Sequence, residues 1–247
     1  MTPEALAAAV VRFNFDPINY SHPSWWVHGG LSKPVHRQLA DNPAAASMLS
    51  RKMLADYRID DQFDFDFTHP FKRIAFLTYE QQKQVIFQLG LVIYSAHIAR
   101  AVHVTEQDRL LKLIDYSDYL LALRMKLDHK LVSGLHLPVL PLSDRQQFRV
   151  AVYLAGFSLL TNILAPERAG YKKRFYFTWP KQAAVKRLSA RFSTGRSTVK
   201  QSESDKTRVE RLAALPDHIL YCRQLDDPEL LAMGKRLLGT LLSIRGW

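Results

Sequence analysis

Residues 78–104 read TYEQQKQVIFQLGLVIYSAHIARAVHV, and this stretch decides the fold class. At 100° per residue, apolar side chains fill two opposite faces of a helix and leave only a narrow polar strip. A helix that is apolar on most of its circumference must be surrounded by other elements. We therefore predict a mainly α protein built around a central helix of about 27 residues and roughly 40 Å, with Thr78 as its N-cap. The apolar faces are Val85, Ile86, Leu89, Val92, Ile93 and Ala96, and Phe87, Leu91, Tyr94, Ile98 and Val102; the polar strip is Gln81, Gln84, Gln88 and Ser95.

Gly90 lies in the middle of this stretch, where glycine costs on the order of 1 kcal/mol of helix propensity relative to alanine. We interpret Gly90 as the point at which a neighbouring helix approaches closely. The apolar run ends before His97 and Arg100 after about a dozen residues, whereas a bilayer span needs ~20. The stretch is therefore predicted to be a buried helix and not a transmembrane segment.

The chain has 247 residues, of which 47% are hydrophobic, and a single cysteine, Cys222. This length and apolar content predict a globular protein of one or two domains. One cysteine excludes an intramolecular disulfide and a cysteine-based zinc site. The start, MTPEALAAAVVRFNF, lacks the basic and apolar regions of a secretory leader, which predicts a cytoplasmic location.

The net charge of +11 is concentrated in residues 166–211, where 13 lysines and arginines face four acidic residues. The rest of the chain carries a net charge of only +2. The basic charge therefore indicates the kind of partner that this one segment contacts, and it is not a property of the whole surface. We predict three parts: a helical core domain over 1–165, a basic segment and flexible linker over 166–211, and C-terminal helices over 212–247 that pack back on the core.

Residues 12–31 contain two prolines, two glycines and five aromatic residues with no helical period, which predicts an extended, turn-rich aromatic arm. Ser32 and Asn42 each precede a proline in the manner of an N-cap, so short helices are expected near 34–41 and 43–57. The buried face expected for the second of these helices is Met48, Leu49, Met53, Leu54 and Tyr57.

Residues 63–71 read FDFDFTHPF, so three phenylalanines alternate with Asp64 and Asp66. Period two predicts a short extended connector with the rings on one side and the two carboxylates on the solvated side. Further helices are predicted from an N-cap at Thr105 to Leu127, and from a cap at Ser143 to a point before Pro166.

Catalytic and metal-binding patterns are missing from the sequence. It contains no nucleophile elbow, glycine-rich phosphate loop or dinucleotide fingerprint. His97 and His103 would lie about 120° apart around one helix and could not chelate one ion. Asp64 and Asp66 could form a carboxylate pair, but the alternation with phenylalanine favours a solvated strand face. We predict a protein without enzymatic activity, cofactor or bound metal.

Two aromatic features are candidate contacts for a partner. Trp25 and Trp26 are adjacent, so in an extended segment they point to opposite sides: either one ring serves a partner, or both cover helix ends at a loop. The basic segment interleaves cations with aromatic rings, which suits an acidic protein surface, the head groups of an inner leaflet, or single-stranded nucleic acid. The candidate partner-binding cations are Lys172, Lys173, Arg174, Lys186, Arg187 and Arg191, and the rings are Tyr171, Phe175, Tyr176, Phe177 and Trp179.

Two stretches together resemble a known family. FNFDPINYSHPSWW at 13–26 and QVIFQLGLVIYSAHIARAV at 84–102 are similar to the corresponding regions of the SctK proteins of bacterial type III secretion systems, the family of YscK, PscK, MxiK and OrgA. The second stretch carries more information, through Leu89-Gly90-Leu91 and the later Arg100. The resemblance covers the first half of the chain, and residues 166–211 have no counterpart in it.

The resemblance implies a mainly helical, non-enzymatic adaptor in the cytoplasmic sorting platform, at the base of the secretion apparatus beneath the inner membrane. Members of the family link the cytoplasmic domain of the inner-membrane ring protein, SctD, to the pod protein, SctQ, which carries the ATPase through its regulator. A basic helical protein that binds nucleic acid is the alternative, although no recognised nucleic-acid motif occurs in the chain.

Overall fold

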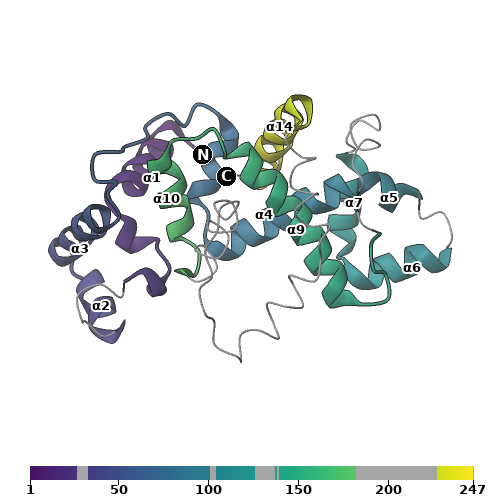
Figure 1. The fold of residues 1–247 in the computed structure, drawn as a ribbon, viewed down its shortest axis with the longest axis horizontal. Coiled ribbons are helices and arrows are strands. Elements are labelled where there is room, and N and C mark those ends of the chain that lie inside the picture. Colours follow the sequence, from purple (N-terminus) through teal and green to yellow (C-terminus); the bar gives the residue numbers. More distant parts are fainter. Residues whose placement is uncertain (27–32, 101–103, 126–136, 138, 182–226, 247) are drawn as a thin grey trace, which may run out of the picture. The chain divides into compact units, whose positions relative to one another are not determined.

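The computed structural model describes all residues except 27–32, 101–103, 126–136, 138, 182–226 and 247, and every regular element among the described residues is a helix (Figure 1). The predicted mainly α fold is therefore confirmed. Within the described ranges, no helix combines the length and hydropathy that crossing a bilayer requires.

The chain forms two compact units. Unit 1 comprises Met1–Glu80, Glu167–Thr198 and Gly246–Trp247, and unit 2 comprises Gln81–Pro166 and Val199–Arg245. This division differs from the predicted boundary at residue 165, because the start of the basic segment folds with the N-terminal residues.

Unit 1 holds the N-terminal helices together with a helix from the basic segment. Asn42 caps α3 as predicted, with its side chain accepting from the backbone N–H groups of Ala44 and Ala45. The expected buried face of α3 is correct at Leu49 and Met53, but Met48 is 64% exposed. The elements are α1 (Pro3–Phe15), η1 (Pro17–Asn19), η2 (Pro23–Trp25), α2 (Lys33–Ala40), α3 (Pro43–Asp56), η3 (Pro70–Phe76) and α10 (Ala169–Phe177).

The predicted extended arm is wrong over its first residues, which end helix α1. Thr2 caps this helix, Pro3 occupies its first turn, and the alanine-rich sequence that follows favours helix. The helix stops at Asp16 because Pro17 disfavours helical geometry in the residue before it. Two 3₁₀ turns, η1 and η2, then replace a fully extended course.

Unit 2 contains the helices around the predicted central element. Its caps differ slightly from expectation: Asp144, not Ser143, caps α9, and Thr105 lies inside α6. The predicted 105–127 helix is two helices, because the chain breaks at Ile114 and Asp115. The elements are α4 (Tyr79–Ile93), whose first two residues belong to unit 1, α5 (Ser95–Arg100), α6 (Val104–Leu113), α7 (Tyr116–Arg124), α9 (Arg145–Ile163) and α14 (Pro228–Ile244).

The central helix is shorter than predicted. α4 ends at Ile93 and α5 begins at Ser95, so the expectation of one rod over 78–104 is wrong. Hydrogen bonding continues through the interruption, since the carbonyl of Tyr94 accepts from the backbone N–H groups of both His97 and Ile98, each at 2.9 Å. α5 contacts α7, which follows it later in the chain.

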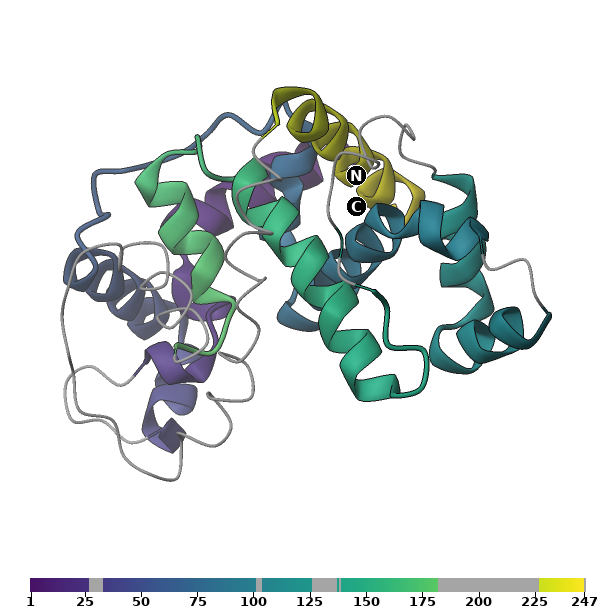
Figure 2. The same cartoon turned by 45° about the vertical axis from the view of Figure 1, so that its right-hand side comes forward.

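The interpretation of Gly90 is confirmed. A Cβ atom built on Gly90 would overlap the carbonyl oxygen of Val152 on α9, and one built on Gly156 of α9 would overlap the carbonyl oxygen of Ile86 on α4. The two helices therefore meet backbone to backbone. Figure 2 shows α14, in yellow, beside α9, with which it is in contact.

Candidate functional site

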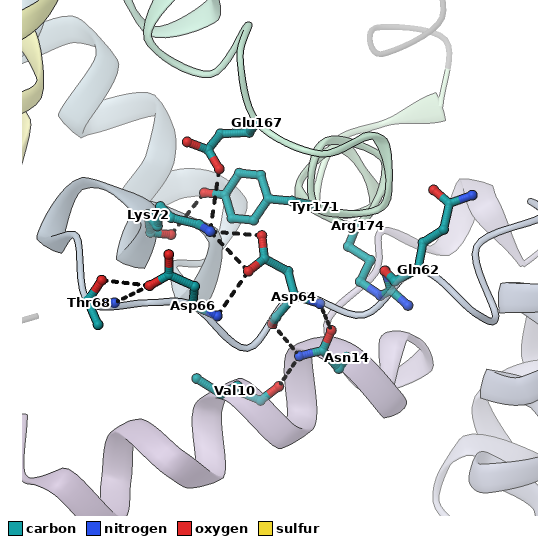
Figure 3. Close-up of polar contacts among 10 residues, drawn as sticks. All are labelled: Val10, Asn14, Gln62, Asp64, Asp66, Thr68, Lys72, Glu167, Tyr171 and Arg174. Atoms are coloured by element: carbon teal, nitrogen blue, oxygen red, sulfur yellow. Dashed lines mark hydrogen bonds and ion pairs between the residues drawn. The ribbon is translucent and has the colours of Figure 1, made fainter.

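A buried ion-pair cluster ties the three sequence-distant parts of unit 1 together (Figure 3). Lys72 Nζ lies 3.0 and 2.8 Å from the two carboxylate oxygens of Asp64 and 3.4 Å from Glu167 Oε2. Both Lys72 and Asp64 are only 3% exposed. Asp64 was predicted on the solvated side of an extended connector, and that prediction is wrong because Lys72 neutralises its charge in the core.

The backbone around Asp64 is held by a side chain from α1. Asn14 Nδ2 donates to the carbonyl of Asp64 at 2.7 Å, and Asn14 Oδ1 accepts from the Asp64 N–H at 2.9 Å. Tyr171 of α10 donates its hydroxyl to the carbonyl of Lys72 at 2.9 Å. Burial raises the pKa of Tyr171 well above its ordinary value, and the carboxylates of Glu167 and Asp64 add to the shift.

The three phenylalanines of the connector are buried to different degrees, although the rings of Phe63 and Phe65 lie together, with their centroids 6.1 Å apart. Phe67 is buried, Phe63 is half-buried, and Phe65 is 60% exposed. Phe15 from the end of α1 lies 4.8 Å from Phe63 and 6.2 Å from Phe65 between ring centroids. The extended connector is thus pinned by the ring of Phe67 and by the charge of Asp64.

Arg174 was predicted to contact a partner, and the structure places it in the core instead, with no exposed surface. Its guanidinium donates to the carbonyls of Gln62 and Ile59, the latter at 2.8 Å, and lies 5.6 Å from the ring centroid of Phe63. Burial lowers the pKa of Arg174, while neighbouring Tyr20 and Asp64 oppose that shift. Arg174 therefore serves the fold of unit 1.

The two lysines before Arg174 lie nearer the surface. Lys173 is exposed, and its Nζ donates to the carbonyl of Tyr57 at 2.9 Å. Lys172 is half-buried. Both side chains remain candidates for a partner contact. The other predicted cations, Lys186, Arg187 and Arg191, lie outside the described residues.

The aromatic rings of this segment are not arranged as a stacking surface. Tyr171, Phe175, Phe177 and Trp179 are all buried in unit 1, and Tyr176 is half-buried. Bases of a single strand stack on exposed rings. In this conformation, the buried rings of residues 171–179 are therefore not accessible for stacking with nucleic-acid bases.

The adjacent tryptophans differ in burial, although the segment is not extended as expected: Pro23–Trp25 form the 3₁₀ turn η2. Trp25 is buried: its Nε1–H donates to the carbonyl of Trp179, and its ring lies 5.2 Å from that of Phe177. Trp26 is half-buried, and its Nε1–H donates to Ser21 Oγ at 2.8 Å. Of the two candidates, Trp25 belongs to the core, and Trp26 faces a groove.

This hollow, called the unit 1 groove below, has a volume of about 820 Å³ and is open to solvent, with a mainly apolar lining. One wall is a face of α1 on which Ala5, Ala8, Ala9 and Arg12 recur at helical spacing. Apolar ligand pockets of roughly 300–1,000 Å³ are typical binding sites. The other walls are residues 18–23, Trp26, the end of α2 with Arg37, Ala40 and Asp41, residues 75–79, and Thr178.

Sequence reasoning missed the groove, although it singled out Trp26. The alanine face of α1 was a detectable signal, but Arg37 and Thr178 reach the same hollow only through the tertiary fold. The prediction that His97 and His103 cannot chelate one ion is not tested by the structure, because His103 lies outside the described residues. In the part of the chain that the structure describes, no group of three or more His, Cys, Asp or Glu side chains is placed to hold a metal ion.

Comparison of the chain with protein-family models, with curated proteins and with solved structures finds no match.

Proposed function

We propose that this chain is a non-enzymatic cytoplasmic adaptor of a bacterial type III secretion system, which links an SctD-like ring protein to an SctQ-like pod protein. The proposal begins from the resemblance of residues 13–26 and 84–102 to the SctK family. These two stretches lie in different units, the first in unit 1 and the second in unit 2. Each contributes buried residues to its unit, among them Phe13, Trp25, Leu89 and Ile93.

The observation that carries the proposal is the unit 1 groove. Its apolar lining, open to solvent over about 820 Å³, suits a protein segment laid into a groove between helices. A second unit with its own core gives the chain a separate surface for a second partner. An adaptor that links two proteins needs a binding surface for each of them.

The proposal includes an order in which the proteins of the sorting platform contact one another. The ring protein's cytoplasmic domain holds the adaptor beneath the inner membrane, and the pod protein follows. The ATPase and its regulator are reached only through the pod protein, so they make no direct contact with this chain.

The test is reconstitution with the full-length chain as the affinity-tagged component. We expect it to retain the SctD-like cytoplasmic domain and the SctQ-like pod protein singly and together, and to retain the ATPase regulator only when the pod protein is present. Failure to retain either the ring or the pod protein would refute the adaptor role. Retention of the regulator without the pod protein would refute the proposed order.

The nucleic-acid alternative is tested on the same preparation. A phosphate-contact mode predicts binding to random single strands, with log K falling linearly with log salt concentration. We expect no binding at sub-micromolar strength in physiological salt, because the rings needed for stacking are buried. Such binding, together with absent ring and pod binding, would favour the alternative.

A further inference from the structure

We propose that the unit 1 groove binds an amphipathic helix of a partner protein whose polar face carries carboxylates. This inference rests on the proposed function and assigns one site of the adaptor its occupant.

The shape of the groove favours a helix. Ala5, Ala8 and Ala9 lie on one face of α1, and their small side chains let a partner backbone approach toward the short end of the 8–10 Å range of helix separations. The lining also includes larger rings, among them Trp26 and Tyr79. With a helix diameter of about 10–12 Å and a rise of ~1.5 Å per residue, the 820 Å³ hollow corresponds to roughly six residues, nearly two turns.

The charge of the lining favours acidic residues on that helix. Arg12 and Arg37 are both exposed at the groove, and neither is ion-paired with a carboxylate among the described residues. Arg12 is held in place by donating to the carbonyl of Asn19 at 2.8 Å. The acidic lining residue in the described part of the chain is Asp41, so the lining carries a net positive charge.

A mainly apolar lining that also carries two exposed arginines favours an occupant that has both kinds of surface. A helix with one apolar and one acidic face satisfies both requirements at once. Its apolar side chains would pack on the alanine face, and its carboxylates would pair with Arg12 and Arg37.

Two synthetic helical peptides of about 18 residues serve as probes, a length above the ~12–15 below which isolated helices are marginal. They share leucines at helical spacing and differ only in carrying glutamate or lysine on the polar face. Fluorescence anisotropy with the full-length chain measures binding. We expect the glutamate peptide to bind, more weakly as salt rises, and the lysine peptide to bind at least tenfold more weakly.

Variants of the groove sharpen the test. Ala8→Trp fills the groove and should weaken glutamate-peptide binding at least tenfold, whereas Ala7→Trp, on an exposed neighbour outside the lining, should not. Arg37→Glu should reduce the preference for glutamate over lysine, whereas Arg51→Glu, an exposed arginine of α3 outside the groove, should leave it intact. Thermal melts of each variant establish that unit 1 stays folded.

Three outcomes of the peptide assay would overturn the inference: no binding of the glutamate peptide, equal binding of the lysine peptide, or equal effects of Ala8→Trp and Ala7→Trp. The result is separable from the proposed function. Peptide binding as expected, with ring and pod proteins both failing to co-purify, would leave the groove assignment standing without the adaptor role. Undiminished retention of both proteins by Ala8→Trp would keep the adaptor role and refute the groove.

Discussion

Replacing Arg174 with methionine should unfold unit 1 at a lower temperature, because this arginine is a core residue and not a surface contact. Arg174 is fully buried and donates to the carbonyls of Gln62 and Ile59. Hydrogen bonds from a charged donor are worth about 1.5–3 kcal/mol each, and their loss leaves two buried carbonyls without partners. We therefore expect a loss of about 3–5 kcal/mol, close to the upper range for a single substitution.

The assay is thermal and urea unfolding of the full-length chain, followed by circular dichroism. A change of 1 kcal/mol shifts the melting temperature of a domain of this size class by about 2–4 °C, so the expected shift for Arg174→Met is roughly 6–20 °C. Lys173→Met is the matched control, since Lys173 is the exposed neighbour on the same helix. It should melt within about 0.5 kcal/mol of the unchanged chain.

One pattern would refute this reasoning. If Arg174→Met melted like the unchanged chain and instead weakened binding of the ring or pod protein, Arg174 would be a partner contact, as its place in a basic run suggested. The burial of the guanidinium among Ile59, Gln62 and Phe63 would then be wrong.

Three further predictions use the same unfolding assay. Gly90→Ala should destabilise unit 2 by about 1–3 kcal/mol, because the new Cβ would overlap the backbone of α9. Gly234→Ala is the control and should be neutral or stabilising, because its Cβ would meet only the ends of side chains. Equal melting temperatures of the two variants would contradict the close approach of α4 and α9. Lys72→Met should cost about 3–5 kcal/mol by leaving buried carboxylates uncompensated, and an unchanged urea midpoint would contradict this. His97 is largely exposed, and its partial desolvation, followed by the charge of nearby Arg100, lowers its pKa below 6.5. The unfolded chain therefore takes up the proton more readily, and stability should fall modestly as pH drops through 6.5. His97→Gln should reduce that pH dependence, and an identical pH profile would count against it.

The proposed site was only partly predictable from sequence. Trp26 was a candidate because two adjacent tryptophans cannot both enter one core, and the structure leaves Trp26 half-buried at the groove while Trp25 is enclosed. Arg174 was a candidate because charge runs usually lie at the surface. Its burial depends on carbonyls of Ile59 and Gln62, more than a hundred residues earlier in the chain.

The sequence by itself determined those features of the fold that depend on neighbouring residues alone. Asn42 and Asp227 cap helices because their side-chain oxygens accept from backbone N–H groups two and three residues away. The apolar circumference of α4 required burial, and Gly90 required a close neighbour, because both are properties of one segment. The tertiary structure alone decided where α4 ends, how Asp64 is neutralised, and which walls enclose the groove. Those outcomes depend on contacts between segments that are distant in the sequence. The free energy of a buried charge depends on the groups that surround it in the fold, and no local sequence pattern specifies those groups.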